Sequence, residues 1–273
     1  MTQQWQNKKI LITGAGSGIG QALAKLLASQ GAKLILTDIN SDNLNATCKA
    51  IGHSVLISKQ ADAASTDDWK ALAEQIESEI GHLDALVNNA GMTSFGFFDE
   101  TSADLFDKVM NVNLNGVVIG CRTMLPLLEK SGRGLIVNVS SIFGLITMPM
   151  MSPYHASKFA VRGFTEALKQ DMIYQEKPID VVCVMPGGIK TNIANSAESD
   201  HADPASLAQH FDAVARTTAE QAASTIEKGM RKKTFRVLIG ADAKIVDVLY
   251  KVLPTDYHKV SNFLLGVKQF MKG

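Results

Sequence analysis

The chain has 273 residues, and its 27 Lys and Arg residues balance 27 Asp and Glu residues, so the formal net charge is zero. A neutral chain provides no broad cationic surface, which argues against a nucleic-acid partner. Hydrophobic residues make up 46% and charged residues 20% of the chain, a balance that excludes an intrinsically disordered protein and indicates a globular one.

Seven short apolar segments predict the strands of a buried sheet. These segments are residues 10–12, 33–37, 55–57, 83–87, 135–139, 180–184 and 235–239. They are rich in Val, Ile and Leu and hardly alternate with polar residues, which is typical of parallel strands buried on both faces. Segments with helical spacing lie between them, for example residues 19–29 and 67–80. This alternation predicts an α/β protein with a single-domain Rossmann-type doubly wound fold, in which helices flank a central seven-stranded parallel sheet.

The chain is expected to divide into a catalytic and dinucleotide-binding domain over residues 1–240 and a C-terminal helical extension over residues 241–273. A polar segment at about 192–211 is typical of a substrate lid. Within the extension, apolar residues recur every three or four positions from Val260 to Met271, which predicts an amphipathic helix. We expect the extension to pack on the same domain or on a partner subunit; peripheral contact with a membrane surface is the alternative that we do not favour.

A glycine-rich segment after the first predicted strand indicates a dinucleotide site. The sequence TGAGSGIG occupies residues 13–20. Glycines allow the backbone to turn tightly and to approach a pyrophosphate, and the start of the following helix adds unpaired N–H groups. Asp38 ends the second strand, where its carboxylate can accept hydrogen bonds from ribose hydroxyls. A 2′-phosphate would meet this negative charge without a compensating cation at Ser17 or Ile39, so we expect NAD (NADH) to be favoured over NADP.

Tyr154 and Lys158 lie four residues apart in the segment SPYHASKF, a spacing that places both on one face of a helix. A free phenol has a pKa near 10, which is high for a base at neutral pH, and a nearby ammonium favours the phenolate. We therefore expect Tyr154 to be the general acid/base and Lys158 to lower its pKa while reaching the cofactor ribose. His155 and Ser157 should point elsewhere and take no direct part in the chemistry.

Several motifs in order give the chain a resemblance to the classical short-chain dehydrogenase/reductase family over roughly residues 8–240. They are TGAGSGIG at 13–20, Asp62 after the third strand, NNAG at 88–91, Asn113 in NVNLNG, Ser141 in NVSSIFG, YHASK at 154–158 and PGGIKT at 186–191. The resemblance implies an NAD(P)-dependent oxidoreductase that acts on CH–OH groups, often as a homodimer or homotetramer. It also implies a catalytic set of Asn113, Ser141, Tyr154 and Lys158.

The resemblance assigns roles to single residues. Asn113 would bend its helix and hold a water of a proton relay, Ser141 would orient the substrate oxygen, and Asp62 would contact the adenine ring. The implied cofactor-binding residues are Gly14, Ser17, Gly18, Ile19, Gly20, Asp38, Asp62, Asn89, Ala90, Gly91, Tyr154, Lys158, Pro186, Gly187, Ile189 and Thr191.

Two apolar segments flank the expected catalytic residues and predict the walls of a substrate pocket. Their apolar side chains are Phe95, Phe97, Phe98, Phe143, Leu145, Met148, Met150 and Met151. Neither segment contains Lys or Arg, which suits an uncharged, hydrophobic alcohol or ketone. We expect substrate contacts from Ser141, Phe143, Met148 and Tyr154; packing in the core or at an oligomer contact is the alternative for the apolar residues.

The favoured function is an NAD(H)-dependent oxidoreductase that interconverts a secondary alcohol and a ketone on a hydrophobic small molecule. The alternatives are a dinucleotide-sensing regulatory protein with little turnover, an NADP(H)-dependent reductase of the same family, and a membrane-associated scaffold. The three cysteines form no CxxC pair and predict neither a metal site nor a disulfide framework. We expect reduced thiols in a cytoplasmic protein, because the N-terminus lacks the apolar run of a signal peptide.

Overall fold

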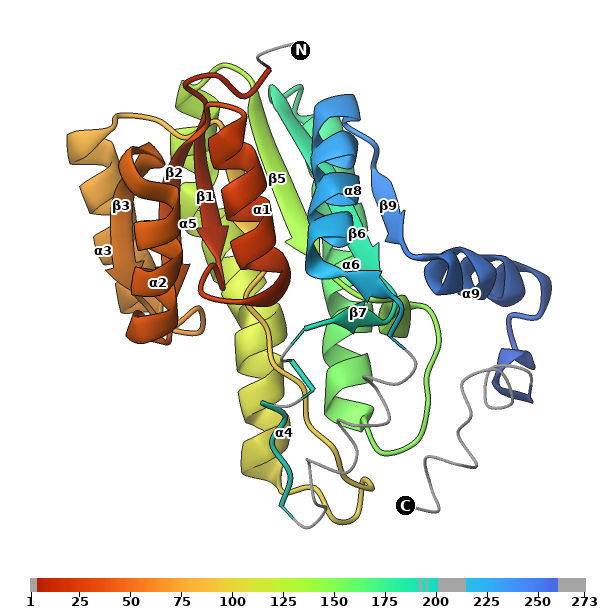
Figure 1. The fold of residues 1–273 in the computed structure, drawn as a ribbon. Helices are drawn as coiled ribbons and strands as arrows, with labels where there is room; N and C mark the ends of the chain where they lie inside the picture. The colour runs from red at the N-terminus through yellow and green to blue at the C-terminus, as the bar shows by residue number, and fades with distance from the viewer. Residues whose placement is uncertain (1–3, 192, 195, 201–214, 260–273) are drawn as a thin grey trace.

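The computed structural model describes residues 4–191, 193–194, 196–200 and 215–259. At its centre is a parallel sheet of seven strands in the order β3-β2-β1-β4-β5-β6-β9 (Figure 1). The strands are β1 (Lys9–Thr13), β2 (Lys33–Asp38), β3 (Val55–Gln60), β4 (Ala85–Asn88), β5 (Gly134–Val139), β6 (Ile179–Pro186) and β9 (Arg236–Ile239). The predicted seven-stranded sheet is confirmed, with strand ends that differ by a few residues. A separate parallel ladder pairs β7 (Ile189–Lys190) with β8 (Thr217–Thr218).

Helices cover both faces of the sheet. They are α1 (Gly18–Ser29), α2 (Ser41–Ile51), α3 (Thr66–Glu79), α4 (Ala103–Met110), α5 (Gly116–Lys130), α6 (Ser152–Tyr174), α8 (Ala219–Lys232) and α9 (Ala241–Val252). Short helical turns are η1 (Gly52–Ser54), η2 (Asn111–Asn115) and η3 (Ile142–Gly144). The apolar sides of α1 and α8 pack on one face, and those of α3, α5 and α6 pack on the other, so the sheet is buried between two helical layers (Figure 1).

The order of the strands determines where a ligand can bind. All seven strands run parallel, so their carboxyl ends meet at one edge, and the chain reverses its winding direction between β1 and β4. In open α/β sheets, ligands bind at such a point because adjacent loops diverge there. The glycine-rich loop follows β1, and Ser141 follows β5 just before η3, so both lie at this edge.

The C-terminal part of the described chain packs against the end of the sheet. α9 lies beside β9 (Figure 1), and its Ala243 and Val246 join an apolar cluster with Ile142, Leu145 and Met185. The helix predicted from Val260 onwards, and most of the lid predicted at 192–211, lie outside the described residues. Among the helices that are described, none is long and apolar enough to cross a membrane.

Candidate active site

The loop between β1 and α1 brings the backbone close to the next strand end. Gly14 and Gly18 have positive φ angles of 63° and 52°, a conformation that residues with side chains rarely adopt. A Cβ atom on Gly14 would lie 2.9 Å from the Cα of Ala90, and one on Gly20 would collide with the carbonyl oxygen of Gly14. Ser17, the exposed N-cap of α1, makes no capping hydrogen bond with its side chain. The start of α1 therefore suits a phosphate group, since backbone N–H groups and a hydroxyl both lie there.

Polar groups from two strand ends fasten this loop to the sheet. The hydroxyl of Thr13 accepts hydrogen bonds from the N–H groups of Asn89 (3.1 Å) and Ala90 (3.0 Å). The side-chain amide of Asn89 donates to the carbonyl oxygens of Thr13 (2.9 Å) and Gly14 (3.1 Å). Asn89 and Ala90 thus shape the glycine loop, and Thr13, the first residue of the glycine-rich motif, contributes to the same arrangement.

Asp38 lies beside the glycine loop at the end of β2. One carboxylate oxygen accepts from the N–H of Gly16 at 2.8 Å, and the other accepts from the N–H of Asn40 at 2.9 Å. These bonds hold the carboxylate in a fixed position while each oxygen keeps a further lone pair. The next residue, Ile39, is 65% exposed and uncharged. This geometry fits the binding of a ribose diol and gives a 2′-phosphate an unfavourable charge.

Asp62 shapes the turn between β3 and α3. One of its carboxylate oxygens accepts from the N–H of Ala64, and its own N–H donates to the carboxylate of Asp68, both at 2.8 Å. The side chain is therefore oriented by local bonds, and its contact with an adenine ring stays a prediction.

The loop after β6 is tied to α9. An oxygen of the Asp242 carboxylate accepts from the N–H of Gly188 at 2.6 Å. A Cβ atom on Gly187, which follows Pro186 at the end of β6, would collide with that carboxylate. Asp242 lies in the first turn of α9, so the C-terminal helix supports a loop that the motifs assign to the cofactor. The sequence offered no signal for this residue, because Asp242 lies outside every recognised motif.

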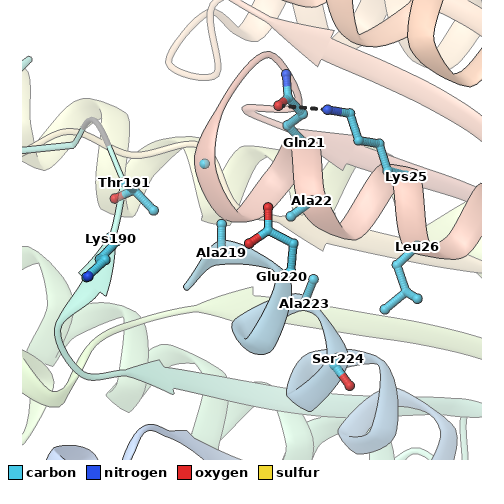
Figure 2. A pocket seen from close by; sticks show the side chains of 11 residues that line it. Gln21, Ala22, Lys25, Leu26, Lys190, Thr191, Ala219, Glu220, Ala223 and Ser224 are labelled. Carbon is cyan, nitrogen blue, oxygen red and sulfur yellow. Dashed lines mark hydrogen bonds between the residues drawn. The ribbon is translucent and has the colours of Figure 1, made fainter. Parts of the chain in front are cut away.

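A groove of about 500 Å³ adjoins the glycine loop between α1, the end of β7 and the start of α8 (Figure 2). Gly18 and Thr191 border it, and the side chain of Thr191 lies 3.2 Å from the position of a Cβ on Gly18. Ile189, also predicted to bind the cofactor, is partly buried against the core. Figure 2 shows the Glu220 carboxylate pointing towards α1, where Lys25 donates to Gln21 at 3.1 Å. Open space therefore continues from the predicted pyrophosphate site along α1.

Ser141, Tyr154 and Lys158 come together where β5 ends and α6 begins. Tyr154 is 9% exposed, Ser141 6% and Lys158 3%. The Ser141 hydroxyl lies close enough to the phenol of Tyr154 to lower its pKa. The ammonium of Lys158 donates to the carbonyl oxygen of Val139 at 3.1 Å and lies 5.6 Å from the centre of the Tyr154 ring. The structure thus joins three members of the predicted catalytic set.

Burial is the largest influence on the pKa values of Tyr154 and Lys158. It raises the pKa of Tyr154 above 10.0, and the hydrogen bond with Ser141 lowers that pKa by less. Burial also lowers the pKa of Lys158 from 10.5 to about 8. Desolvation of the phenolate decides the direction of the Tyr154 shift, and the expected lowering of this pKa by Lys158 stays a prediction. Tyr154 is a phenol at neutral pH, which is the form that donates a proton.

Asn113 lies in a π-helical turn, η2, which interrupts the path from α4 to α5. Its Oδ1 accepts from the N–H of Met92 at 2.8 Å. Its Nδ2 donates to the carbonyl oxygen of Met92 and to the hydroxyl of Ser157, both at 2.9 Å. A Cβ on Gly91 would lie 3.1 Å from Oδ1, so this glycine leaves room for the amide. The bend at Asn113 fits the expectation, whereas its role in a water relay stays a prediction.

Ser157 has a larger part in the site than predicted. Its hydroxyl is fully buried, accepts from Asn113 and donates to the carbonyl oxygen of Tyr154 at 2.7 Å. The serine links the π-helical turn to α6 at the residue that carries the phenol. Helical spacing correctly placed Ser157 away from the reacting face, but spacing alone does not show which neighbouring element meets the opposite face.

Apolar side chains surround one side of Tyr154. Phe95, Met148, Met151, Ala194 and Ala197 form a buried cluster with Tyr154, and Phe143 and Met150 pack against it. The ring of Phe143 meets that of Tyr154 edge-on, with 6.3 Å between centroids. An apolar surface beside Tyr154 suits a hydrophobic substrate.

Three of the residues predicted to form the pocket wall do not belong to this cluster. Phe97 is 41% exposed and Phe98 is 74% exposed, because the segment after Phe95 turns outwards to the surface. Leu145 is fully buried but packs with Ile142 and α9 instead. The order of apolar residues along the sequence does not show which of them pack around Tyr154 and which pack against α9.

Most of the chain matches a known protein family. A model described as short chain dehydrogenase matches residues 8–202. The chain belongs to the short-chain dehydrogenase/reductase family. The putative oxidoreductase SadH of Mycobacterium tuberculosis is 41% identical over 271 residues, which cover 97% of each chain. The cyclohexanol dehydrogenase of an Acinetobacter species is 37% identical over 213 residues, 76% of this chain and 82% of that protein.

Solved structures agree with this family. A short-chain dehydrogenase/reductase from Burkholderia phymatum, crystallised in complex with NAD, superposes with a TM-score of 0.84 at 29% identity. The match covers 93% of this chain and 96% of that one. Levodione reductase superposes with a TM-score of 0.78 at 28% identity. This chain is accordingly an oxidoreductase of the short-chain dehydrogenase/reductase family, and its cofactor is a nicotinamide dinucleotide.

Among the described residues, no group of three or more His, Cys, Asp or Glu residues could hold a metal ion. The glycine loop, Asp38 and the start of α1 fit a dinucleotide, because Ser17 makes no capping hydrogen bond at the helix start and the Asp38 carboxylate lies beside the loop.

Proposed function

We propose that this protein interconverts a secondary alcohol and a ketone on a hydrophobic small molecule, with NAD(H) as cofactor and Tyr154 as general acid/base. The observation that supports this most directly is the proximity of Ser141 and Tyr154, which lie against an apolar cluster beside the buried Lys158. Each element of that arrangement meets one need of the reaction: a polar contact for the substrate oxygen, a proton and a hydrophobic environment for the carbon skeleton.

Residues at the carboxyl edge of the sheet would hold the cofactor. The glycine loop and the start of α1 would bind its pyrophosphate, and Asp38 would accept hydrogen bonds from the adenosine ribose. Lys158 would reach the other ribose, and the loop from Pro186 to Thr191 would flank the nicotinamide. When bound, the dinucleotide supplies or accepts the hydride. The preference for NAD over NADP rests on the charge of Asp38.

In the direction of reduction, the Ser141 hydroxyl would hold the ketone oxygen and Tyr154 would donate a proton to that oxygen. Burial keeps Tyr154 protonated at neutral pH, which is the state that a proton donor needs. Lys158 would stabilise the tyrosinate that remains, since an opposite charge nearby favours the ionised form. Asn113 would keep Tyr154 and its helix in position through Ser157.

The apolar cluster supports an uncharged ring or chain as substrate, bound near Phe143 and Met148. The similarity to a cyclohexanol dehydrogenase points to cyclic alcohols as the first compounds to test. We further propose a cytoplasmic homodimer or homotetramer; free Cys48, Cys121 and Cys183 fit a reducing compartment.

The test is a panel of cyclic, aromatic and steroid-sized secondary alcohols and their ketones, assayed with both NAD(H) and NADP(H). We expect turnover of neutral hydrophobic members with a higher kcat/KM for NAD(H). Tight NADH binding without turnover across the panel would favour a dinucleotide sensor instead. A higher kcat/KM with NADPH would favour an NADP(H)-dependent reductase of the same family.

A further inference from the structure

His155 follows the proposed proton donor directly, yet its side chain contacts a different part of the site. The imidazole is buried, with 4% of the residue exposed. It lies beneath the segment from Ile142 to Met148, which connects Ser141 to the apolar cluster around Tyr154. Met148 N and the Phe143 carbonyl oxygen lie within hydrogen-bond distance of the ring, and the backbone of Ile146 also acts on its pKa.

The hydrogen bonds fix the tautomer of His155. The backbone N–H of Met148 can only donate, and it lies 3.0 Å from Nε2, so Nε2 carries no proton. The proton of the neutral ring therefore lies on Nδ1, which is 3.2 Å from the carbonyl oxygen of Phe143 and donates to it. Burial lowers the pKa of His155 and so favours this neutral form. One ring thus joins two backbone positions that are five residues apart along the chain.

Both positions lead directly to the substrate side. The ring of Phe143 meets His155 edge-on at 4.9 Å and Tyr154 edge-on at 6.3 Å, measured between centroids. Met148 lies in the apolar cluster with Tyr154. The N-terminal part of the segment has its own attachments, because the Ser141 hydroxyl accepts from the N–H of Phe143 and the Gly144 carbonyl oxygen accepts from Arg162.

Two residues after Met148, the backbone adopts a strained conformation at Met150. Met150 has a φ angle of +67°, a conformation that is uncommon for a residue with a side chain. Its carbonyl oxygen accepts from the N–H of Gly96 at 2.9 Å, which joins the segment to the loop that carries Phe95. Two hydrogen bonds therefore hold this part of the chain. The imidazole accepts from the N–H of Met148, and the carbonyl oxygen of Met150 accepts from the N–H of Gly96.

We propose that His155 is a positioning residue that bridges Phe143 and Met148, holds the apolar wall against Tyr154 and thereby limits the size of the alcohol or ketone that the site accepts. This inference rests on the proposed function. His155 touches no reacting atom in this role; it acts through the backbone of the segment that it bridges.

Two substitutions separate the hydrogen bonds from the volume of the ring. His155→Phe keeps an aromatic ring against Phe143 but removes both hydrogen bonds. His155→Gln keeps one donor and one acceptor on a flexible chain. His53→Phe, at an exposed position in η1, controls for the general effect of replacing a histidine.

The assay compares cyclohexanol with a steroid-sized secondary alcohol in each variant. We expect His155→Phe to lower kcat/KM for cyclohexanol roughly ten- to a hundredfold, as a misplaced wall would. The larger alcohol should lose less, and His155→Gln should recover most of the activity. Affinity for NADH should stay close to that of the wild type, whereas the midpoint of thermal unfolding should fall in His155→Phe, because two buried backbone groups lose their partner, and should recover in His155→Gln.

Two results would overturn the proposal. One is a His155→Phe variant that keeps both the wild-type kcat/KM and the wild-type ratio between the two alcohols. The other is an equal loss for both alcohols in the Phe and Gln variants together with a lower unfolding midpoint, which would indicate a purely structural role.

A second measurement does not depend on turnover. Hydrogen exchange of the Met148 amide, followed by NMR, should be at least about tenfold faster in His155→Phe than in the wild type if the imidazole accepts its hydrogen bond. Unchanged protection would overturn the bridge even if no compound in the panel is a substrate. If the wild type turns over no compound and the Met148 amide exchanges faster in His155→Phe, the bridge is supported and only the proposed function is contradicted.

Discussion

The cofactor side and the substrate side of this site differ in what holds their loops in place. On the cofactor side, Thr13 and Asn89 fasten the glycine loop through backbone hydrogen bonds, and close approaches leave no room for a Cβ at Gly20. On the substrate side, the segment from Ile142 to Met148 depends on apolar packing and on His155. The first arrangement tolerates few residue types at each position, whereas the second can change its shape through single side chains.

This difference matches the different tasks of the two sides, which are to bind the cofactor and to select the substrate. A dinucleotide is the same molecule for every member of a cofactor class, so its loop needs one backbone geometry. A substrate pocket defines which molecule reacts, and its shape follows from the volume and position of apolar side chains. Substitutions on the first side should therefore affect all substrates equally, and those on the second side should affect them unequally.

The largest expected effect comes from Tyr154→Phe, which removes the hydroxyl and keeps the ring. We expect kcat to fall by about 10²- to 10⁴-fold with every substrate, because a general acid/base contributes in this range. Affinity for NADH, measured by fluorescence titration, should change little. Wild-type turnover in this variant would refute the assigned proton donor.

Asp38→Ala tests the cofactor side through its charge. Hydrogen bonds to a charged group contribute about 1.5–3 kcal/mol, so the preference for NADH over NADPH should fall by about ten- to a hundredfold. The ratio of kcat/KM for the two cofactors measures this, and the size preference among alcohols should not change. An unaltered cofactor ratio would show that another group recognises the ribose.

A pair of glycine substitutions tests how strictly the cofactor loop is packed. A Cβ on Gly20 would collide with the Gly14 carbonyl, whereas one on Gly163 in α6 would meet no atom within 4 Å. Gly20→Ala should lower the free energy of unfolding by about 1–3 kcal/mol and weaken NADH binding. Gly163→Ala should instead stabilise the helix by up to about 1 kcal/mol. Urea unfolding of both variants measures this; equal effects would contradict the packing argument.

The smallest expected effect concerns Lys158, which lies between the two sides. In the folded protein its pKa is about 8, below the 10.5 of an unburied lysine. The unfolded chain therefore binds more protons between about pH 8 and 10.5, and this group contributes increasing stability as the pH rises through that window. Burial of the charged form costs stability below pH 8.

Comparison with Lys158→Met measures that contribution. The stability of the variant relative to the wild type should be greater at pH 7 than at pH 9.5, as determined by urea unfolding at both values. A difference that is the same at both pH values would show that the buried lysine does not titrate in this range.

The sequence was sufficient to predict the features that depend on local spacing. Seven apolar segments predicted the strands of the sheet, and the spacing of Tyr154 and Lys158 on one helix, with Ser141 in its own motif, predicted residues that the fold brings together. These predictions succeeded because strand periodicity and helical spacing are properties of the backbone.

Features that depend on packing between distant elements were not predictable in this way. The direction of the Tyr154 pKa shift follows from its burial, which no spacing reveals. Ser157 was expected to take no direct part in the chemistry, and its bond to Asn113 in the π-helical turn had no signal in the sequence. Phe98 was expected in the pocket wall, but its segment turns to the surface. In each case a helix or loop far away in the sequence decides the environment of the residue.

The hydrogen bond between Asp242 and Gly188 has a practical consequence for protein engineering. A chain shortened after Gly240 would lose this carboxylate together with α9, so a drop in activity would not distinguish a missing membrane or subunit contact from a disturbed nicotinamide loop. A chain that ends after Lys259 keeps Asp242 and the whole of α9. Fusion partners and affinity tags at the C-terminus should likewise be attached beyond this helix, because Asp242 in its first turn holds the loop after β6.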